Sequence, residues 1–256
     1  MQTSNSPIET RRLLGTPLAV TDYDQAASLT QVWAREPGVR AVAAANTHMV
    51  AMARHDPAFA ATLSQFDLIV PDGMPLIWAM NRRGAGMRDR VYGPTLMLHV
   101  LARPGLRHFF LGGSEALLKS LVERLGERFP ALEIAGTYAP PFGVWSAEEN
   151  TRIIEKIAAS GARVVWIGLG CPKQERWIAE HKAELPKGVY FAIGAAFAFH
   201  AGKVSQAPAW MQKRGLEWLY RLAVEPRRLW KRYVVYNTLF LWYLLLESLT
   251  GASRKQ

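Results

Sequence analysis

The chain has 256 residues, of which 50% are hydrophobic and 20% charged, with 20 glycines, 15 prolines and one cysteine. These proportions exclude a disordered chain, a collagen-like repeat and a disulfide scaffold. The formal charge is +10, and +7 of it lies from Lys203 onward, where ten basic residues accompany three acidic ones. A lone Cys171 and an N-terminus without a long apolar segment predict a reducing, cytosolic environment.

Six short runs rich in Val, Ile, Phe and Ala predict β-strands. They cover residues 39–45, 67–71, 108–112, 133–139, 163–169 and 189–194. Helical segments alternate with them, and two begin after Ser114 and Ser146, the latter with Glu149 at capping-box spacing. Continuous apolar strands that alternate with helices favour a parallel sheet covered on both faces. The sequence therefore predicts a doubly wound α/β domain.

Strand-end turns carry the candidate chemistry, because parallel sheets bind ligands at the carboxyl ends of their strands. Asp72 directly follows an apolar strand. A carboxylate held there can act as a general base, and burial would raise its pKa toward the working range. The same spacing fits a turn or helix N-cap residue, so both interpretations stay open.

The turn GLGCPKQE at 168–175 predicts an anion site at the start of a helix. Gly168 and Gly170 would let the backbone approach a diphosphate, and Lys173 and Gln174 would face the same ligand. A tight turn without a ligand is the alternative, since the motif is neither G-x-G-x-x-G nor a Walker A loop. Cys171 lacks a sequence feature that would supply an activating base, so we interpret it as a small turn residue.

Metal sites are not indicated by the sequence. The pair Asp22 and Asp24 forms a literal D-x-D, but a helical pattern follows it, so an N-cap is the better interpretation. His48 and His200 fall in strand-end turns without metal-ligand spacing to another His or Cys.

After Pro208 the composition shifts to Trp, Tyr, Leu and Arg, which predicts a helical appendage with a second helix starting at Pro226. Its uncharged run, 233–246, has 14 residues, whereas a membrane span needs about 20. A nucleic-acid site would need stacking aromatics on a recognisable module, and a solvated face would not carry so many aromatics. Arginines and aromatics beside an apolar run favour a helix lying on an anionic membrane surface.

Seven motifs occur in a characteristic order. They are N-T-H-M-V (46–50), V-P-D-G-M-P (70–75), R-V-Y-G (90–93), F-L-G-G (110–113), G-L-G-C-P-K-Q-E (168–175), A-G-K-V-x-x-A-P (201–208) and G-L-E-W-L-Y-R-L (215–222). In this order they resemble the WecG/TagA/CpsF glycosyltransferases, family 26, over roughly residues 40–232.

The resemblance implies an inverting, metal-independent transferase of bacterial cell-surface polysaccharide biosynthesis. It would move a sugar from a UDP-sugar to a saccharide on a polyprenyl diphosphate, with no cofactor, no metal and no nucleic-acid partner. It also implies a Rossmann-like catalytic domain, residues 1–207, and a membrane-targeting appendage, residues 208–256, acting peripherally at the cytoplasmic face. A homo-oligomer stays open.

Carried over by motif, Asp72 matches the general base of the family. The substrate-binding candidates from the motifs and turns are Asn46, Thr47, His48, Arg90, Gly112, Gly170, Lys173, Gln174, Arg221, Arg228 and Arg232. Arg221 and the following Arg227, Arg228 and Arg232 match basic positions of the appendage, some of which would fold over the diphosphate.

Three positions depart from the family pattern. Ala44 replaces a frequent Thr, Ala198 a frequent Asp, and Gln206 a basic residue. The donor therefore stays open between N-acetylmannosamine, its uronic acid and glucose. A non-catalytic UDP-sugar or lipid-diphosphate binding module is the alternative, but binding an anionic donor gains nothing from the carboxylate of Asp72. A Rossmann oxidoreductase would need the missing phosphate fingerprint.

Overall fold

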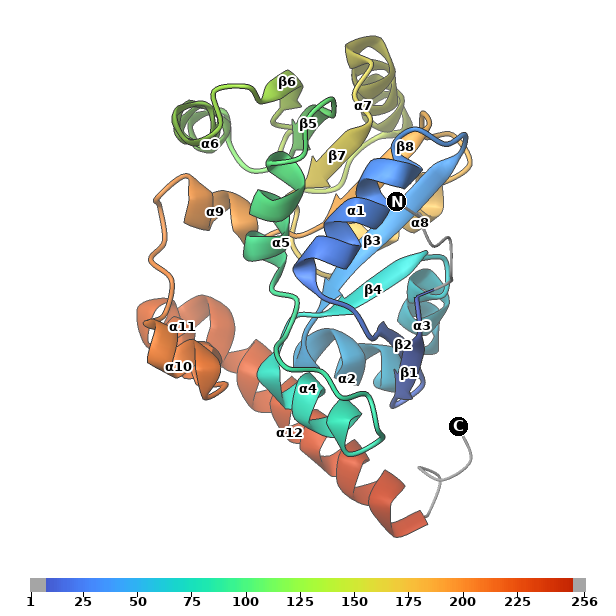
Figure 1. Ribbon diagram of the computed structural model, residues 1–256, viewed down its shortest axis with the longest axis vertical. Helices are drawn as coiled ribbons and strands as arrows, with labels where there is room; N and C mark the ends of the chain where they lie inside the picture. The colour runs from blue at the N-terminus through green and yellow to red at the C-terminus, as the bar shows by residue number, and fades with distance from the viewer. Residues whose placement is uncertain (1–7, 251–256) are drawn as a thin grey trace.

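A six-stranded parallel sheet forms the centre of the molecule in a computed structural model (Figure 1). The structure describes residues 8–250, apart from the side chains of Arg228, Lys231 and Arg232. The strand order is β4-β3-β8-β7-β5-β6, and every neighbouring pair is parallel. The chain thus runs outward from β3 to β4, crosses to the other half of the sheet, and returns to β3 with β8.

The strands of this sheet are β3 (Val39–Ala45), β4 (Leu68–Pro71), β5 (Arg107–Leu111), β6 (Glu133–Tyr138), β7 (Val164–Ile167) and β8 (Gly188–Ala192). The helices within the sheet domain are α1 (Tyr23–Trp33), α2 (Thr47–His55), α3 (Pro57–Leu63), α4 (Met74–Asn81), α5 (Gly93–Leu101), α6 (Glu115–Arg128), α7 (Ala147–Ser160), α8 (Lys173–His181) and α9 (Ala196–His200). Three more helices follow: α10 (Ala209–Lys213), α11 (Glu217–Val224) and α12 (Pro226–Thr250).

Two apolar cores lie on opposite faces of the sheet. One contains buried side chains of α2, α3, α4, α7, α8 and α12, and the other contains those of α1, α5, α6 and α9. Successive residues of β3 alternate between them, with Ala41 and Ala43 in the first and Val42 in the second. Because both faces of the sheet are covered, the inner strands β7 and β8 are buried along their whole length, and this confirms the α/β prediction of a Rossmann-like parallel sheet with helices on both faces.

Local sequence signals also predict the strands and several helix N-caps correctly. All six predicted strands exist with ends shifted by at most two residues, and Asp22, Ser114 and Ser146 are N-caps whose side chains accept a backbone N–H bond. The predictions do not include an N-terminal antiparallel hairpin, β1 (Thr10–Leu13) and β2 (Thr16–Ala19). Its two-residue turn places Leu14 at φ 51° and Gly15 at φ 88°, the geometry of a primed turn.

The last helix, α12, packs along α2 and also contacts α11, and in Figure 1 it runs below α4 and α2. Phe240 is buried at this contact, and the Tyr243 hydroxyl lies 3.0 Å from Nδ1 of His55. A carboxylate of Glu247 forms an ion pair with Arg83 beyond the end of α4. Within residues 8–250, no helix combines the length and apolarity that crossing a bilayer would require.

Candidate active site

A cleft of about 640 Å³ opens where β3, β4, β7 and β8 end. The loops after these strands form its floor and walls, and α11 and the start of α12 close one side with Glu217, Trp218, Arg221, Leu229 and Tyr233. Parallel topology brings these loops together, since all the strands present their carboxyl ends to the same edge. The sheet domain and the C-terminal helices therefore build the cleft jointly.

Asp72 lies in this cleft, directly after β4. Its Oδ1 accepts a 2.6 Å hydrogen bond from the backbone N–H of Gly93, the first residue of α5. The N-cap of α4 is Gly73 and has no side-chain bond, so Asp72 does not cap the helix that follows it. Burial raises the pKa of the Asp72 carboxyl to about 6, while the charge of Arg90 and the Gly93 bond act in the opposite direction.

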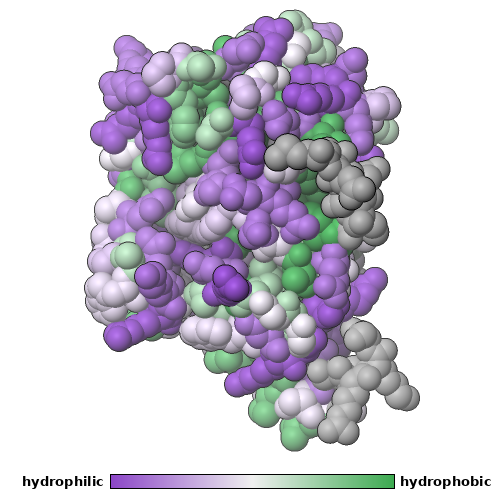
Figure 2. All heavy atoms as spheres, viewed as in Figure 1, coloured by the Kyte–Doolittle hydropathy of each residue, from purple (hydrophilic) through white to green (hydrophobic). Residues whose placement is uncertain are grey.

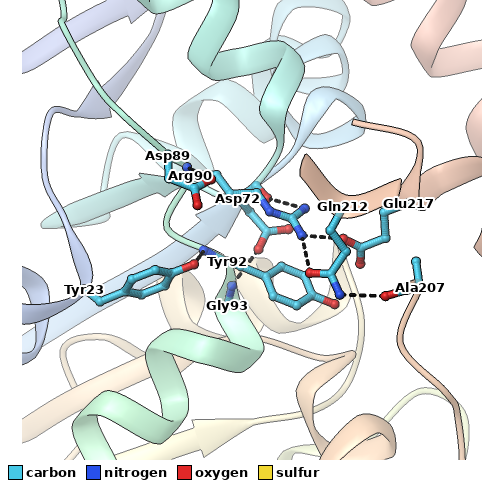
Figure 3. A network of polar contacts seen from close by, with 9 residues as sticks. All are labelled: Tyr23, Asp72, Asp89, Arg90, Tyr92, Gly93, Ala207, Gln212 and Glu217. Carbon is cyan, nitrogen blue, oxygen red and sulfur yellow. Dashed lines mark hydrogen bonds and ion pairs between the residues drawn. The ribbon is translucent and has the colours of Figure 1, made fainter. Parts of the chain in front are cut away.

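Arg90 is buried beside Asp72, and its guanidinium contacts the loop after β4, α10 and α11 (Figure 3). One terminal nitrogen donates to the main-chain oxygen of Asp72 at 3.2 Å. The other donates to Oε2 of Glu217 at 2.6 Å and to Oε1 of Gln212 at 3.1 Å. The guanidinium carbon also lies 4.2 Å from the ring centroid of Tyr92. Arg90 thus joins the carboxyl-end edge of the sheet to the C-terminal helices.

Gln174 stabilises the wall of the cleft that is formed by the loops after β7 and β8. Its Oε1 accepts from the backbone N–H groups of Gly170 and Gly194, both at 3.0 Å. Its Nε2 donates to Oε1 of the fully buried Glu175 at 2.8 Å, which fixes the orientation of the amide. A Cβ at Gly194 would lie only 2.7 Å from Oε1 of Gln174, so glycine is required there. The side chain therefore clamps the loops after β7 and β8 together.

Arg221 contributes a cation to the cleft from α11. Its guanidinium carbon lies 5.4 Å from the ring centroid of Phe199, and a terminal nitrogen lies 3.6 Å from Glu225. Its Nε is buried and has no hydrogen-bond partner in the described part of the chain. This donor is therefore available to an anion in the cleft. The side chains of Arg228 and Arg232, which the sequence also suggests for binding, fall outside the described residues.

Most of the residues singled out by the sequence line the same cleft. They are Asn46, Thr47, His48, Asp72, Arg90, Gly170, Gln174 and Arg221, together with the departing positions Ala44 and Ala198. Asn46 is the N-cap of α2 and accepts from the N–H of Met49 at 3.2 Å. The next two residues also contact α12, because Thr47 Oγ1 donates to Asn237 at 2.8 Å and the His48 ring packs edge-on against Tyr236.

Two candidates lie outside the cleft lining. The ammonium of Lys173 donates to the main-chain oxygen of Gly143 at 2.7 Å and lies 3.8 Å from the ring centroid of Trp145, so it points to the loop before α7. Gly112 has φ 116°, and a Cβ there would lie 2.8 Å from the backbone of Gly168. Its smallness lets two strand-end loops approach each other.

Sequence reasoning did not single out Glu217, Gln212 or Tyr92. Glu217 and Tyr92 stand inside the motifs G-L-E-W-L-Y-R-L and R-V-Y-G. Of the three acidic residues in the basic C-terminal segment, only Glu217 lies inside a motif, and this was the signal that could have identified it. Elsewhere, Nε2 of His200 is hydrogen bonded to the main-chain oxygen of Pro94 at 2.8 Å. Over residues 8–250, no three His, Cys, Asp or Glu side chains gather as a metal site would require.

Comparison with known proteins agrees with this geometry. The profile described as "Glycosyl transferase WecG/TagA/CpsF family" matches residues 11–254, almost the whole chain. The chain belongs to this glycosyltransferase family. The matched range includes both the strand-end loops and the C-terminal helices that share the cleft.

Two curated relatives share one name, N-acetylglucosaminyldiphosphoundecaprenol N-acetyl-beta-D-mannosaminyltransferase. The protein from Bacillus spizizenii is 31% identical over 194 residues, which are 75% of this chain and 73% of the relative. The protein from Bacillus subtilis is 30% identical over 173 residues, 66% of this chain and 65% of the relative.

Proposed function

We propose that this glycosyltransferase moves a hexosyl group from a UDP-sugar to a saccharide on a polyprenyl diphosphate, with Asp72 as general base. The observation that carries the proposal is the partly buried Asp72 carboxylate, with its raised pKa, in the cleft of a family member. The names of the two relatives support a lipid-diphosphate acceptor, and they support keeping N-acetylmannosamine as one candidate sugar.

The reaction is a single displacement. The acceptor hydroxyl oxygen forms a bond to the anomeric carbon of the donor as its proton passes to the Asp72 carboxylate. The bond between the anomeric carbon and the UDP oxygen breaks on the opposite face, so the configuration inverts. The Gly93 N–H bond fixes Oδ1, and a pKa near 6 leaves the carboxylate ionised at neutral pH and still basic enough to accept a proton.

Charge that builds on the departing diphosphate needs a counter-charge. The N–H groups of Gly170 and Gly194 already donate to Gln174, so they do not serve the diphosphate. Arg221 has a buried Nε and lies in the cleft, which supports it as the main cation for this purpose. A guanidinium can supply the electrostatic stabilisation that a metal ion supplies in other transferases. We therefore propose a metal-independent reaction.

The test measures UDP release by the purified protein with UDP-sugar donors and a polyprenyl-diphosphate acceptor, in excess EDTA. We expect Asp72→Asn to lower turnover about 10²- to 10⁴-fold, the usual contribution of a general base. Asp24→Asn is the matched control, because its side chain is 80% exposed on α1. NMR of the product reports the anomeric configuration. Full turnover by Asp72→Asn, or retention of configuration, would overturn the mechanism, and donor binding without UDP release would indicate a binding module.

We further propose that the C-terminal helices hold the enzyme on an anionic membrane surface at the cytoplasmic face. The side of α12 opposite α2 carries exposed apolar residues at helical spacing: Val234 (55% exposed), Leu241 (66%), Trp242 (53%), Leu245 (51%) and Leu249 (74%). Figure 2 shows hydrophobic atoms at the lower end of the molecule, where Figure 1 places α12. Such a stripe beside basic residues favours insertion at the level of the lipid headgroups.

Vesicle flotation tests the membrane proposal. Removing residues 208–256 would uncover the apolar side of α2, so substitutions on the exposed stripe are preferable. We expect L241Q/L245Q to lower binding to anionic vesicles about tenfold or more, because each leucine contributes more than about 1 kcal/mol when buried in lipid. F142Q/V144Q is the matched control, since both side chains are almost fully exposed in the loop before α7. Equal loss in both variants would contradict the proposal.

A further inference from the structure

Glu217 is a buried acidic residue that lines the cleft, and it is the first residue of α11. Its side chain is 12% exposed, and its partner is Arg90, whose side chain is 9% exposed. The two residues are 127 positions apart in the chain. A buried ion pair of this kind contributes little to stability compared with an apolar pair, so its charges are better explained by what they do to a neighbouring group.

The guanidinium of Arg90 stands between two carboxylates but bonds to only one of them. It donates to the carboxylate of Glu217, whereas at Asp72 it donates to the main-chain oxygen. Gln212 accepts from the same terminal nitrogen as Glu217 and is itself held, since its Nε2 donates to the main-chain oxygen of Ala207 at 2.7 Å (Figure 3). Contacts from the C-terminal segment therefore direct Arg90 away from the Asp72 carboxylate.

We propose that Glu217 is a positioning residue for the base: it binds Arg90 so that the Asp72 carboxylate stays unpaired and basic. The inference rests on the proposed role of Asp72. Without the Glu217 charge, Arg90 would be left as an uncompensated buried cation beside Asp72, and its nearest anionic partner would be the carboxylate that has to accept a proton. A carboxylate paired with arginine is a weaker base. The base is therefore fully competent only when α11 is docked.

The charges facing Asp72 come from three elements. Arg90 and Tyr92 lie on the segment before α5, Glu217 and Arg221 lie on α11, and Tyr23 lies on α1. Arg90 and Arg221 lower the pKa of the Asp72 carboxyl, whereas Glu217 raises it. Replacing Glu217 by Gln removes the one acidic neighbour in this set and leaves both guanidiniums in place. The sign of the effect is therefore fixed: the Asp72 pKa falls.

The direct experiment is a carbon-13 NMR titration of the Asp72 carboxyl in the full chain, with the resonance assigned by Asp72→Asn. We expect the midpoint in E217Q to lie about one pH unit below that of the wild type. The acidic limb of kcat/KM is expected to move by the same amount and in the same direction. E247Q is the matched control, because Glu247 is 13% exposed and also forms an ion pair with an arginine of the sheet domain, away from Asp72. Its midpoint should equal that of the wild type.

A merely structural role for Glu217 would lower activity without moving the midpoint, and an unmoved midpoint in E217Q overturns the proposal. If a lone buried Arg90 prevents E217Q from folding, R90Q/E217Q removes both charges and leaves none uncompensated. Its Asp72 midpoint should lie at or above that of the wild type, and a lower midpoint overturns the proposal. Failure of the proposed function has a different signature, since Asp72→Asn would then keep its turnover whatever the midpoints are.

Discussion

The two walls of the cleft use opposite means to hold their shape. The wall formed by β4, the start of α5 and α11 is built from buried charges, with Asp72, Arg90 and Glu217 close together. The wall formed by the loops after β7 and β8 is built from glycines and one amide, with Gln174 accepting from Gly170 and Gly194 and donating to the buried Glu175 behind them. The first wall presents ionised side chains to the cleft, whereas the second presents backbone that one amide holds in place.

The difference shows that only the wall containing Asp72 keeps an ionised group at a cost in folding free energy. Burial disfavours the ionised form of Asp72 and raises its pKa to about 6, so the charged wall is costly to keep ionised at neutral pH. The second wall pairs its backbone donors locally, because the Gln174 amide oxygen accepts from Gly170 and Gly194 while its nitrogen donates to Glu175. The first wall should therefore gain stability when its charge is removed, and the second should lose stability when its amide is removed.

Removing the amide is expected to give the larger effect. In Gln174→Ala the N–H groups of Gly170 and Gly194 lose their acceptor, and leaving a buried N–H unpaired costs about 1–3 kcal/mol. We expect the free energy of unfolding in urea to fall by about 3 kcal/mol and the KM for the donor to rise. Gln31→Ala is the control, since its amide donates only to an exposed main-chain oxygen. Equal free energies of unfolding for Gln174→Ala and Gln31→Ala would contradict the role of Gln174 in holding the two loops together.

Removing the charge of Asp72 is expected to stabilise the protein. The folded pKa of about 6 lies above the usual value of 3.8, so the folded state binds the proton more tightly and the wild type becomes more stable as pH falls from 6 to 4. Asp72→Asn lacks this dependence. At pH 8 it should be more stable than the wild type by about 2–3 kcal/mol, with the difference vanishing near pH 4.

Urea unfolding at pH 4 and pH 8 checks this. Asp24→Asn should match the wild type at both values, because that carboxylate is exposed. If Asp72→Asn is less stable than the wild type at pH 8, the carboxylate is held by favourable contacts and the charged wall is not strained.

The smallest effect is expected at Lys173, where sequence and structure give opposite expectations. The motif places it near an anionic ligand, whereas the structure directs its ammonium to Gly143 and Trp145. We expect Lys173→Met to change kcat/KM by less than twofold and stability by less than about 1 kcal/mol, the value of an exposed cation–π contact. Arg221→Met is the comparison, with a much higher KM for the donor. A large KM effect at Lys173 would extend the binding surface to the loop before α7.

The fold was predictable because its signals are local. Apolar runs specify the six parallel strands, and Asp22, Ser114 and Ser146 cap helices through bonds within three residues. The β1–β2 hairpin was missed because four-residue strands carry little periodicity, although Leu14-Gly15 contains a turn signal. Strand-end position also sufficed to gather Asp72, Gln174 and Asn46 at one cleft.

The rest of the site depends on contacts that spacing cannot supply. Arg90 and Glu217 meet across 127 positions, and the direction of the Lys173 side chain is set by a loop 30 positions away. Likewise, the sequence predicts Gly170 as a backbone donor for the ligand, while Gln174 engages its N–H in the folded chain. Tertiary partners, rather than residue types, decide which polar groups remain available to a substrate.

The contact between α12 and α2 limits how freely this family member can be rebuilt. Thr47 and His48, which begin α2 in the cleft, bond to or pack on Asn237 and Tyr236, and His55 at its end meets Tyr243. The last helix and the helix that lines the cleft thus share one seam. A chimera that takes its last helix from a relative would have to take positions 47, 48 and 55 from the same source.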